Sequence, residues 1–334
     1  MAATRADVAR LAGVSPSTVS YVLSGKRPTS PETQERVRQV VKELGYSPNN
    51  LASGLASPAI RTIGVFFRLH RLIVDTTDLS YVAGVREAAH EGGAHVVLPV
   101  IRGESPLQDL QNLVRSRSID AAVLMDVVQD DEREPLLLNE QIPTVMIGSS
   151  GREAGAPSID ADFSQETRLC LEHLQVLGHR RVLAAMREVH AGGPHVYHQQ
   201  VHTLRENAEQ LGMELDVHCT AESVLDGARM VSQDGLVGSC TAFISNNTKA
   251  MNGIVCAAEA YGMQMPRDYS GVALGLSEEA ATPQRLLTES SVNRRDMGYR
   301  AGKLLLGAEG TKQPTKVFMQ AELFDRGSTG TAKR

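Results

Sequence analysis

The chain has 334 residues, of which 42% are hydrophobic and 22% are charged, and its formal net charge is −5. These values fit a globular protein of about two domains, and no apolar run reaches the ~20 residues that a membrane span needs. The start, MAATRADVAR, lacks the layout of a signal peptide, and the four cysteines show no C-x-x-C spacing. We therefore expect a cytoplasmic protein without a membrane partner, a disulfide framework or a bound metal.

The charge is distributed unevenly along the chain. Residues 1–61 carry eight Lys and Arg against four Asp and Glu, a net +4, whereas the other 26 basic and 35 acidic residues give −9. A basic head on an acidic body is typical of a small phosphate-contacting module attached to a domain with another task.

Three short helices are predicted in the head. The first spans residues 5–12 and stops at Gly13; the second follows a Ser15 cap and ends at residues 24–25; the third runs from Ser30 to Leu44. Two helices joined by a short turn through glycine and braced by a third describe a helix-turn-helix. The expected apolar faces are Val8 and Leu11; Val19, Val22 and Leu23; and Val37, Val40, Val41 and Leu44.

The next segment, YSPNNLASGLASP at residues 46–58, has space for two helical turns between Pro48 and Pro58. A helix this short is marginal in water, and Gly54 costs roughly another 1 kcal/mol. We expect it to form only when something holds it.

From residue 62 onward, apolar runs alternate with amphipathic segments, which predicts parallel sheets with helices on both faces. About ten strands over some 260 residues suit two doubly wound lobes, with a ligand site at the strand carboxyl ends between them. The predicted strands are 62–67, 95–100, 121–125, 143–148, 181–186, 213–218, 241–245 and 269–275. The predicted helices include 82–91, 165–177, 201–211 and 250–261.

These segments resemble the LacI/GalR (lactose-repressor/galactose-repressor) family of bacterial transcription regulators. The resemblance is strongest in DVARLAGVSPSTVS (7–20) and ELGYSPN (43–49), and it continues in EHLQVLGHRR (172–181) and DRGST (325–329). It implies an all-α helix-turn-helix head at 1–48, a hinge helix at 49–58 and a periplasmic-binding-protein-like α/β core. The core would have an N-terminal lobe (61–161 and 292–318) and a C-terminal lobe (162–291 and 319–330).

The resemblance also implies a homodimer that binds a pseudo-palindromic operator in double-stranded DNA and responds to a small-molecule effector. Base contacts would come from Pro16, Ser17 and Tyr21, and from Ala52 and Leu55 of the hinge, where Leu55 would wedge into the minor groove. Phosphate contacts would come from Ser15, Thr18, Ser20, Ser24, Ser30, Thr33 and Asn49. Relatives usually carry arginine in the place of Tyr21, and tyrosine cannot contact guanine in the same bidentate way.

The effector residues depart from the family pattern. Gln200 stands in place of a sugar-binding arginine, and Ser277 stands in place of an aspartate, which removes two charge-assisted contacts to hydroxyl groups. We therefore expect an effector other than an ordinary free hexose, with a cationic or hydrogen-bond-donating ligand as one alternative. The candidate effector residues are His70, Asp126, His198, Gln200, Glu222, Asn247 and Ser277.

Metal binding, catalysis and ligand binding without regulation are the three alternatives to this interpretation. His190, His195, His198 and His202 lie close in sequence, but no acid or cysteine accompanies them, so effector contact by His195 or His198, or a plain surface role, is favoured over metal binding. No P-loop, G-x-S-x-G or H-E-x-x-H motif occurs, which excludes the commonest enzyme signatures, and no cofactor is expected. The remaining alternative is a soluble ligand-binding protein of the same core fold without a regulatory role.

The ending GSTGTAKR has no leucine heptads, so a dimer is expected rather than a tetramer.

Overall fold

The computed structural model describes residues 4–24, 29–44, 60–67, 76–99, 106–188, 193, 195–275, 287–307 and 316–333. The chain divides into two compact units, Met1–Ala59 and Ile60–Arg334. The predictions for Asn49, Ala52, Leu55, His70 and Ser277, and for the side chain of Ser24, lie outside the described residues. Within the described residues, no helix combines the length and apolar character that crossing a membrane requires.

The head contains the three predicted helices, α1 (Arg5–Ala12), α2 (Pro16–Ser24) and α3 (Pro31–Leu44). Thr4 and Asp7 form a reciprocal capping box on α1, and Gly13 ends the helix at φ 65°, where a side chain would be strained. Ser15 accepts a hydrogen bond from the Thr18 amide at 3.1 Å, so it caps α2 as predicted. The helix-turn-helix is thus confirmed down to its caps.

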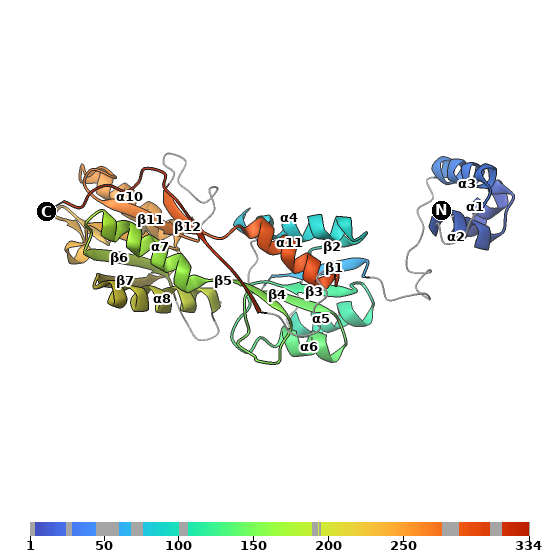
Figure 1. The fold of residues 1–334 in the computed structure, drawn as a ribbon, viewed down its shortest axis with the longest axis horizontal. Coiled ribbons are helices and arrows are strands. Elements are labelled where there is room, and N and C mark those ends of the chain that lie inside the picture. Colours follow the sequence, from blue (N-terminus) through green and yellow to red (C-terminus); the bar gives the residue numbers. More distant parts are fainter. Residues whose placement is uncertain are drawn as a thin grey trace. The chain divides into compact units, whose positions relative to one another are not determined.

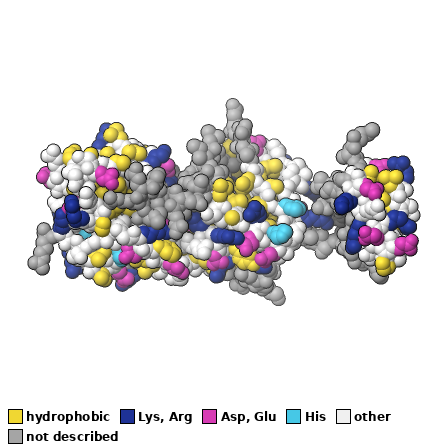
Figure 2. Space-filling model, turned by 90° about the horizontal axis from the view of Figure 1, so that it is seen from above, with side chains coloured by type: hydrophobic (Ala, Val, Ile, Leu, Met, Phe, Trp, Pro, Cys, Tyr) yellow, Lys and Arg dark blue, Asp and Glu magenta, His cyan; other side chains and the backbone are white. Residues whose placement is uncertain are grey.

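The small core of the head is built almost entirely from valine and alanine. Val8, Val19 and Val37 are fully buried, one from each helix, and Ala9, Ala12, Val22 and Val40 complete the cluster. The prediction that Leu11 belongs to this face is wrong, because its side chain is 55% exposed. One turn of a helix separates Val8 from Ala12, and this pair of positions turns Leu11 toward solvent. Acidic and basic side chains both lie on the visible face of the head (Figure 2).

The N-terminal lobe of the second unit is a six-stranded sheet in the order β13-β5-β4-β3-β1-β2, with every neighbouring pair parallel. Helices α4 and α11 cover one face of this sheet, and α5 and α6 cover the other (Figure 1). The strands are β1 (Thr62–Phe66), β2 (His95–Val97), β3 (Ala121–Leu124), β4 (Thr144–Ile147), β5 (Ser158–Ala161) and β13 (Lys316–Met319); the helices are α4 (Thr76–Glu91), α5 (Pro106–Arg115), α6 (Arg133–Asn139) and α11 (Arg294–Leu305).

The C-terminal lobe is a second six-stranded sheet in the order β14-β12-β11-β10-β6-β7, in which only β14 runs antiparallel to its neighbour. A small antiparallel pair, β8–β9, is attached to it. The strands are β6 (Arg181–Arg187), β7 (Glu214–Thr220), β8 (Val231–Ser232), β9 (Gly235–Leu236), β10 (Ala242–Ser245), β11 (Ser270–Leu274), β12 (Thr288–Ser291) and β14 (Glu322–Phe324). The helices are α7 (Phe163–Val176), α8 (His195–Leu211), α9 (Val224–Ala228) and α10 (Thr248–Ala260).

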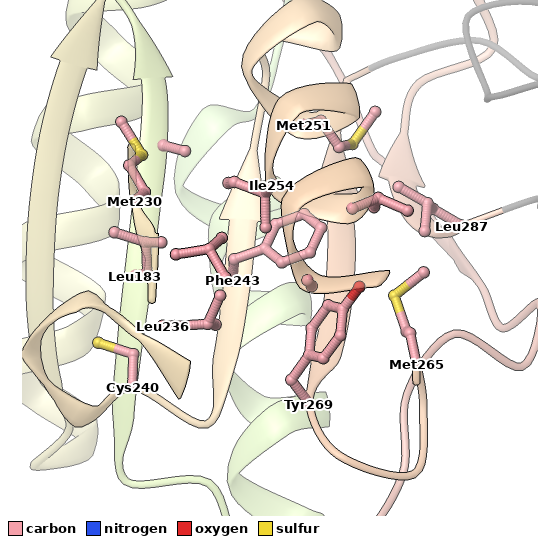
Figure 3. Close-up of a cluster of buried hydrophobic side chains, with 14 of the residues drawn as sticks. Leu183, Met230, Leu236, Cys240, Phe243, Met251, Ile254, Met265, Tyr269 and Leu287 are labelled. Atoms are coloured by element: carbon pink, nitrogen blue, oxygen red, sulfur yellow. The ribbon is translucent and has the colours of Figure 1, made fainter. Parts of the chain in front are cut away.

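The central strands of both sheets are buried on both faces, as in parallel sheets between helices. On β6, Val182, Ala184 and Met186 pack toward α7 and α8, whereas Leu183 and Ala185 pack toward α10. Figure 3 shows the α10 side, where the ring centroids of Phe243 and Tyr269 lie 6.3 Å apart among aliphatic and methionine side chains. The prediction of two doubly wound lobes is confirmed.

Candidate functional site

A cavity of about 160 Å³ lies where the strands of both sheets end. The carboxyl edges of both sheets contribute lining residues to this cavity. These residues directly follow strands: Met125 follows β3, Gly148 follows β4, Asn246 follows β10 and Gly275 follows β11. This is the edge at which doubly wound folds bind ligands. The position predicted for a ligand site is therefore hollow in the structure.

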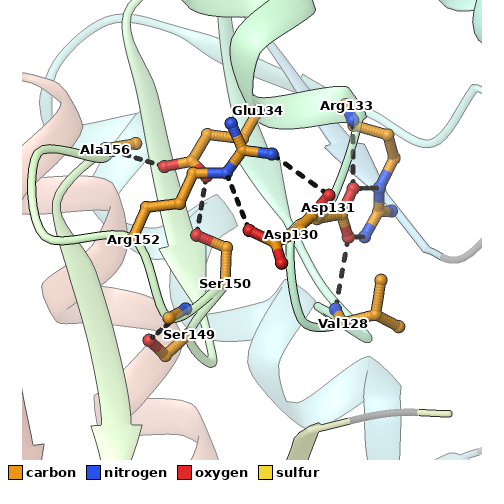
Figure 4. A network of polar contacts seen from close by, with 10 residues as sticks. Val128, Asp130, Asp131, Arg133, Glu134, Ser149, Ser150, Arg152 and Ala156 are labelled. Atoms are coloured by element: carbon orange, nitrogen blue, oxygen red, sulfur yellow. Dashed lines mark hydrogen bonds and ion pairs between the residues drawn. The ribbon is translucent and has the colours of Figure 1, made fainter. Parts of the chain in front are cut away.

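A polar network that includes the buried Asp131–Arg133 pair lies next to the cavity residues Met125, Asp126 and Val127 in the chain, and Figure 4 shows it. Arg133 donates to both carboxylate oxygens of Asp131, at 2.9 and 2.7 Å, and also to the backbone carbonyls of Phe66 and Met125. Since those carbonyls close β1 and β3, the guanidinium joins the ends of two strands. The next residue, Asp126, lines the cavity with a left-handed backbone, φ 51°, which aspartate tolerates better than most residues.

A chain of three amide and carboxyl side chains forms the C-terminal lobe's side. Asn246 donates to the Oε1 atom of Gln200 at 2.7 Å, and Gln200 donates through Nε2 to Glu166 at 3.1 Å. All three side chains are at least 96% buried and line the cavity. The Gln200 carbonyl and one of its two N–H groups are therefore already satisfied within the protein.

Two arginines line the cavity, and each is held by protein groups. Arg187 pairs with Glu222 at 2.5 Å, donates to the Tyr197 hydroxyl at 2.8 Å and donates to the Asn246 carbonyl at 3.0 Å. Arg294 donates to the Gly275 carbonyl and to the Tyr81 hydroxyl, and its guanidinium lies over the Tyr81 ring. Both guanidinium groups therefore already donate to protein acceptors, whereas a sugar-binding arginine would direct its N–H groups toward the ligand.

Burial shifts the pKa of two carboxyl groups and one imidazole in the cavity lining. Burial raises the pKa of Asp160 to about 7, opposed only by one hydrogen bond from the Ala161 amide. Burial also raises the pKa of Glu166 to about 7, against the opposing effects of Gln200 and Arg294. Burial lowers the pKa of His195, and the neighbouring His198 lowers it further, which keeps the imidazole neutral at pH 7.

The predicted effector residues are distributed over the core in two groups. Asp126 and Gln200 line the cavity together, and so does His195, which was weighed with them. Three others do not reach its wall: Glu222 is engaged with Arg187, His198 is exposed on α8, and Asn247 caps α10 through a hydrogen bond from Ala250. Within the described residues, no group of three His, Cys, Asp or Glu side chains is placed to hold a metal ion.

Several cavity residues were not predicted from the sequence, among them Asp78, Tyr81, Asp160, Glu166, Asn246 and Arg294. Asp160 was missed because β5 has the sequence SIDA, whose polar residues do not read as a buried strand. The available signal was an acid five residues before the predicted helix 165–177 and two residues before Asp162, which caps α7.

The candidate DNA-contacting groups lie at the two matching helix starts of the head. Ser15 and Thr18 share a hydrogen bond of 2.8 Å between their hydroxyls, and Ser30 and Thr33 repeat this arrangement at 2.8 Å at the start of α3. In each pair one hydroxyl proton is used internally and the other can be donated outward, as phosphate recognition at a helix start requires. Pro16 and Ser17 are exposed, Tyr21 is partly exposed, and Ser20 donates to the Pro16 carbonyl.

Comparison with known proteins gives two family matches. Residues 4–49 match "Bacterial regulatory proteins, lacI family", and residues 171–329 match "Periplasmic binding protein-like domain". Catabolite control protein A of Staphylococcus xylosus is 28% identical over 282 residues, covering 80% of each chain.

Solved structures show the same fold. The lac repressor dimer bound to operator and an anti-inducer matches with a TM-score of 0.80 at 23% identity, covering 99% of this chain and 100% of that one. A complex of the transcriptional regulator CelR with cellobiose matches with a TM-score of 0.67 at 23% identity, covering 98% and 99% of the two chains.

Proposed function

Because the chain is a LacI-family DNA-binding transcriptional regulator with a periplasmic-binding-protein-like effector domain, we propose that it is a repressor controlled by a ligand in the cavity between its lobes. The family consists of transcription regulators and not of enzymes. In this proposal the protein acts in the cytoplasm as a homodimer on a pseudo-palindromic operator, and each subunit places one head in a major groove.

The observation that carries the proposal is that one chain combines a helix-turn-helix unit with a second compact unit that contains a cavity. The start of α2 presents Pro16 and Ser17 to solvent, so these side chains are open to base edges. The hydroxyl pairs at Ser15 and Ser30 lie at helix starts, where the helix dipole favours phosphate. Reading and anchoring groups are thus presented by one small unit.

For the hinge, we propose the family's arrangement over residues 49–58. Two copies of this segment would form helices over the operator centre, and Leu55 of each would enter the minor groove beside Ala52 and Asn49. The wedge exchanges a few kcal/mol of base unstacking for a bend that extends the contact surface.

For the effector, we propose a molecule other than an ordinary free hexose. Among the related structures, the CelR complex contains cellobiose. In this chain the sugar-binding arginine is replaced by Gln200, whose amide is already engaged with Asn246 and Glu166. The effector roles predicted for His70, His198, Glu222, Asn247 and Ser277 stay predictions.

The test is a deletion at the boundary between the two units. Full-length protein should protect a palindromic site in DNA around its own gene from nuclease cleavage, and the fragment 60–334 should not. The fragment should still show the same ligand-induced rise in melting temperature as the full chain, because it contains both sheets and the cavity. A full-length protein that protects no site, but still responds to ligand, would instead be a ligand-binding protein without a regulatory role.

A further inference from the structure

The charges around the cavity are unbalanced in the acidic direction. Four carboxyl groups line it, and the two arginines are the cationic side chains among its lining residues. Arg187 is neutralised by Glu222, which lies outside the lining, and Arg294 interacts electrostatically with Glu166 and Glu289. The titratable groups that surround the cavity are Asp78, Tyr81, Asp126, Asp160, Glu166, Arg187, His195, Tyr197 and Arg294.

Asp160 is one of these acids, and a single hydrogen bond holds its carboxyl group. Its side chain is 7% exposed, and its Oδ1 atom accepts one hydrogen bond, at 2.9 Å, from the amide of the next residue. Among the described residues, no cation or further hydrogen-bond donor contacts it. A carboxylate buried to this degree is normally paired, since leaving it unpaired costs free energy.

The contrast with Asp131 shows what is missing. Asp131 is equally buried, at 4% exposure, but it has a bidentate partner in Arg133 and receives the Val128 and Arg133 amides as well. Burial opposes its ionisation, yet these hydrogen bonds keep its pKa below the usual value. Asp131 contacts a guanidinium, whereas Asp160 lines a cavity. A ligand in that cavity can therefore supply the cation that Asp160 lacks.

We infer that the effector carries a protonated amine and that Asp160 binds it. This inference rests on the proposed function, since it names the chemical class of the effector. His195, being neutral, adds a hydrogen-bonding group without opposing charge. The rest of the wall favours a short apolar body on the same ligand, because Met125, Val127, Ile147, Phe163, Val292 and Met297 line the cavity.

The amine should bind more tightly as pH rises through 7. In the empty protein Asp160 and Glu166 are each protonated on a substantial fraction of molecules near pH 7. A cation binds the ionised carboxylate. Below pH 7 the carboxyl group must first release its proton, which weakens binding, whereas above pH 7 it is already ionised. A neutral polyol, which can hydrogen-bond to either form, should show little dependence on pH.

The experiment compares matched ligands on the full-length protein by isothermal titration at pH 6 and pH 8. The pairs are putrescine with 1,4-butanediol, and cyclohexylamine with cyclohexanol; in each pair amino groups replace hydroxyl groups, and the amines stay protonated at both pH values. We expect at least one amine to bind ten-fold or more tightly than its partner, and more tightly at pH 8 than at pH 6. Asp160→Asn should abolish this preference, whereas Asp234→Asn, an exposed acid in the β8–β9 turn, should leave it unchanged.

The inference is overturned if neither pair shows an amine preference, or if the preference persists in Asp160→Asn. Should that variant not fold, the pH dependence in the unaltered protein decides: amine affinity that does not rise between pH 6 and pH 8 contradicts a role for Asp160. Nuclease protection of the operator is measured on the same preparation. If the protein protects its operator but shows no amine preference, only this inference is contradicted. If it protects no operator, the proposed function is contradicted.

Discussion

At the scale of single residues, the core shows how the surroundings of a carboxyl group decide its effect on stability. Asp131 contributes stability as an ion because Arg133 and two amides hold its charge. Asp160 and Glu166 are destabilising as ions because burial disfavours their charge. A group whose folded pKa exceeds its unfolded pKa retains protons that the unfolded chain has lost, so its contribution falls as pH rises between the two values. For Asp160 and Glu166 that window runs from about pH 4 to about pH 7.

Asp160→Asn should therefore stabilise the empty protein at pH 8 and stabilise it much less at pH 5, near the lower end of this window. The asparagine keeps the acceptor for the Ala161 amide and removes the buried charge. We expect a gain on the order of 1–4 kcal/mol at pH 8, measured by chemical denaturation of the unliganded protein. The control, Asp131→Asn, should lose about 3 kcal/mol at the same pH because it leaves Arg133 buried without its partner. Equal effects of Asp160→Asn at both pH values would contradict the raised pKa.

Tyr21→Arg is expected to change base preference in the head. Tyr21 lies on α2, one helical turn after Ser17. An arginine can contact guanine with two hydrogen bonds, which discriminates between bases by about 1–3 kcal/mol. Selection from a randomised operator library should show the preference altered at one position in each half-site. Arg36→Gln, on the exposed surface of α3, should lower affinity without altering that preference. An unchanged preference in Tyr21→Arg would remove Tyr21 from the base-contacting set.

At the scale of elements, two helix pairs in the core pack through glycines with almost no space between backbones. A Cβ atom on Gly298 of α11 would lie 2.0 Å from the Tyr81 carbonyl of α4, and one on Gly84 of α4 would lie 1.9 Å from the Arg295 carbonyl. This approach sets Tyr81 beside Arg294 at the cavity. Gly227 of α9 and Gly253 of α10 form a second reciprocal pair of the same kind.

Gly298→Ala should force α4 and α11 apart, since the opposing atom is backbone and cannot rotate away. We expect a loss of about 2–4 kcal/mol in the free energy of unfolding, together with weaker binding of any cavity ligand. Gly92→Ala provides a matched control, because its Cβ would meet only the flexible end of Leu306. Denaturant unfolding of both variants checks the difference, and similar losses at the two positions would mean that the helices can separate without cost.

The elements also show which parts of the fold the sequence could predict. Strands with uninterrupted apolar residues, such as β3, β6 and β10, were predicted within one or two residues, because both faces of each are buried. Strands β5 (SIDA) and β12 (TESS) were missed, since their polar residues satisfy internal bonds that only the tertiary structure provides. In the site, Gln200 was found by motif position and Asp126 as an acid expected to face the cleft, whereas Asp160 was recognised only through its burial at the cavity.

Two family motifs prove to be structural partners in this fold. His173 shares a hydrogen bond with Thr329 at 2.8 Å, and His179 contacts the Gly330 carbonyl at 3.0 Å, which joins EHLQVLGHRR to the last residue of DRGST and to the residue after it. Asp325 accepts hydrogen bonds from the Thr288 hydroxyl and the Gly327 amide. These contacts attach the last residues of the chain to the C-terminal lobe, which gives both motifs a structural role. None of the residues that make them lines the cavity.

At the scale of the whole molecule, the head and the core have opposite charge and different tasks. The first 61 residues have a net charge of +4 and the remainder −9, so the core repels the DNA that the head attracts. That repulsion is screened beyond about 8 Å at physiological ionic strength. Joining two heads through a dimeric core can raise affinity by a factor of roughly 10²–10⁴. The gain from linkage exceeds the screened repulsion, and the core should strengthen DNA binding despite its charge.

The fragment 1–59 should therefore bind the operator at least about 10²-fold more weakly than the full chain at physiological salt. It forms a compact unit with its own core, so helical circular dichroism should be retained. Since a single head contacts half as many phosphates as a dimer, the slope of log affinity against log salt should also be about half as steep. Fluorescence anisotropy on one labelled operator, with a half-site as control, measures both quantities. If the fragment and the full chain show equal slopes and equal affinities, only one head engages the operator and the proposed dimeric mode is wrong.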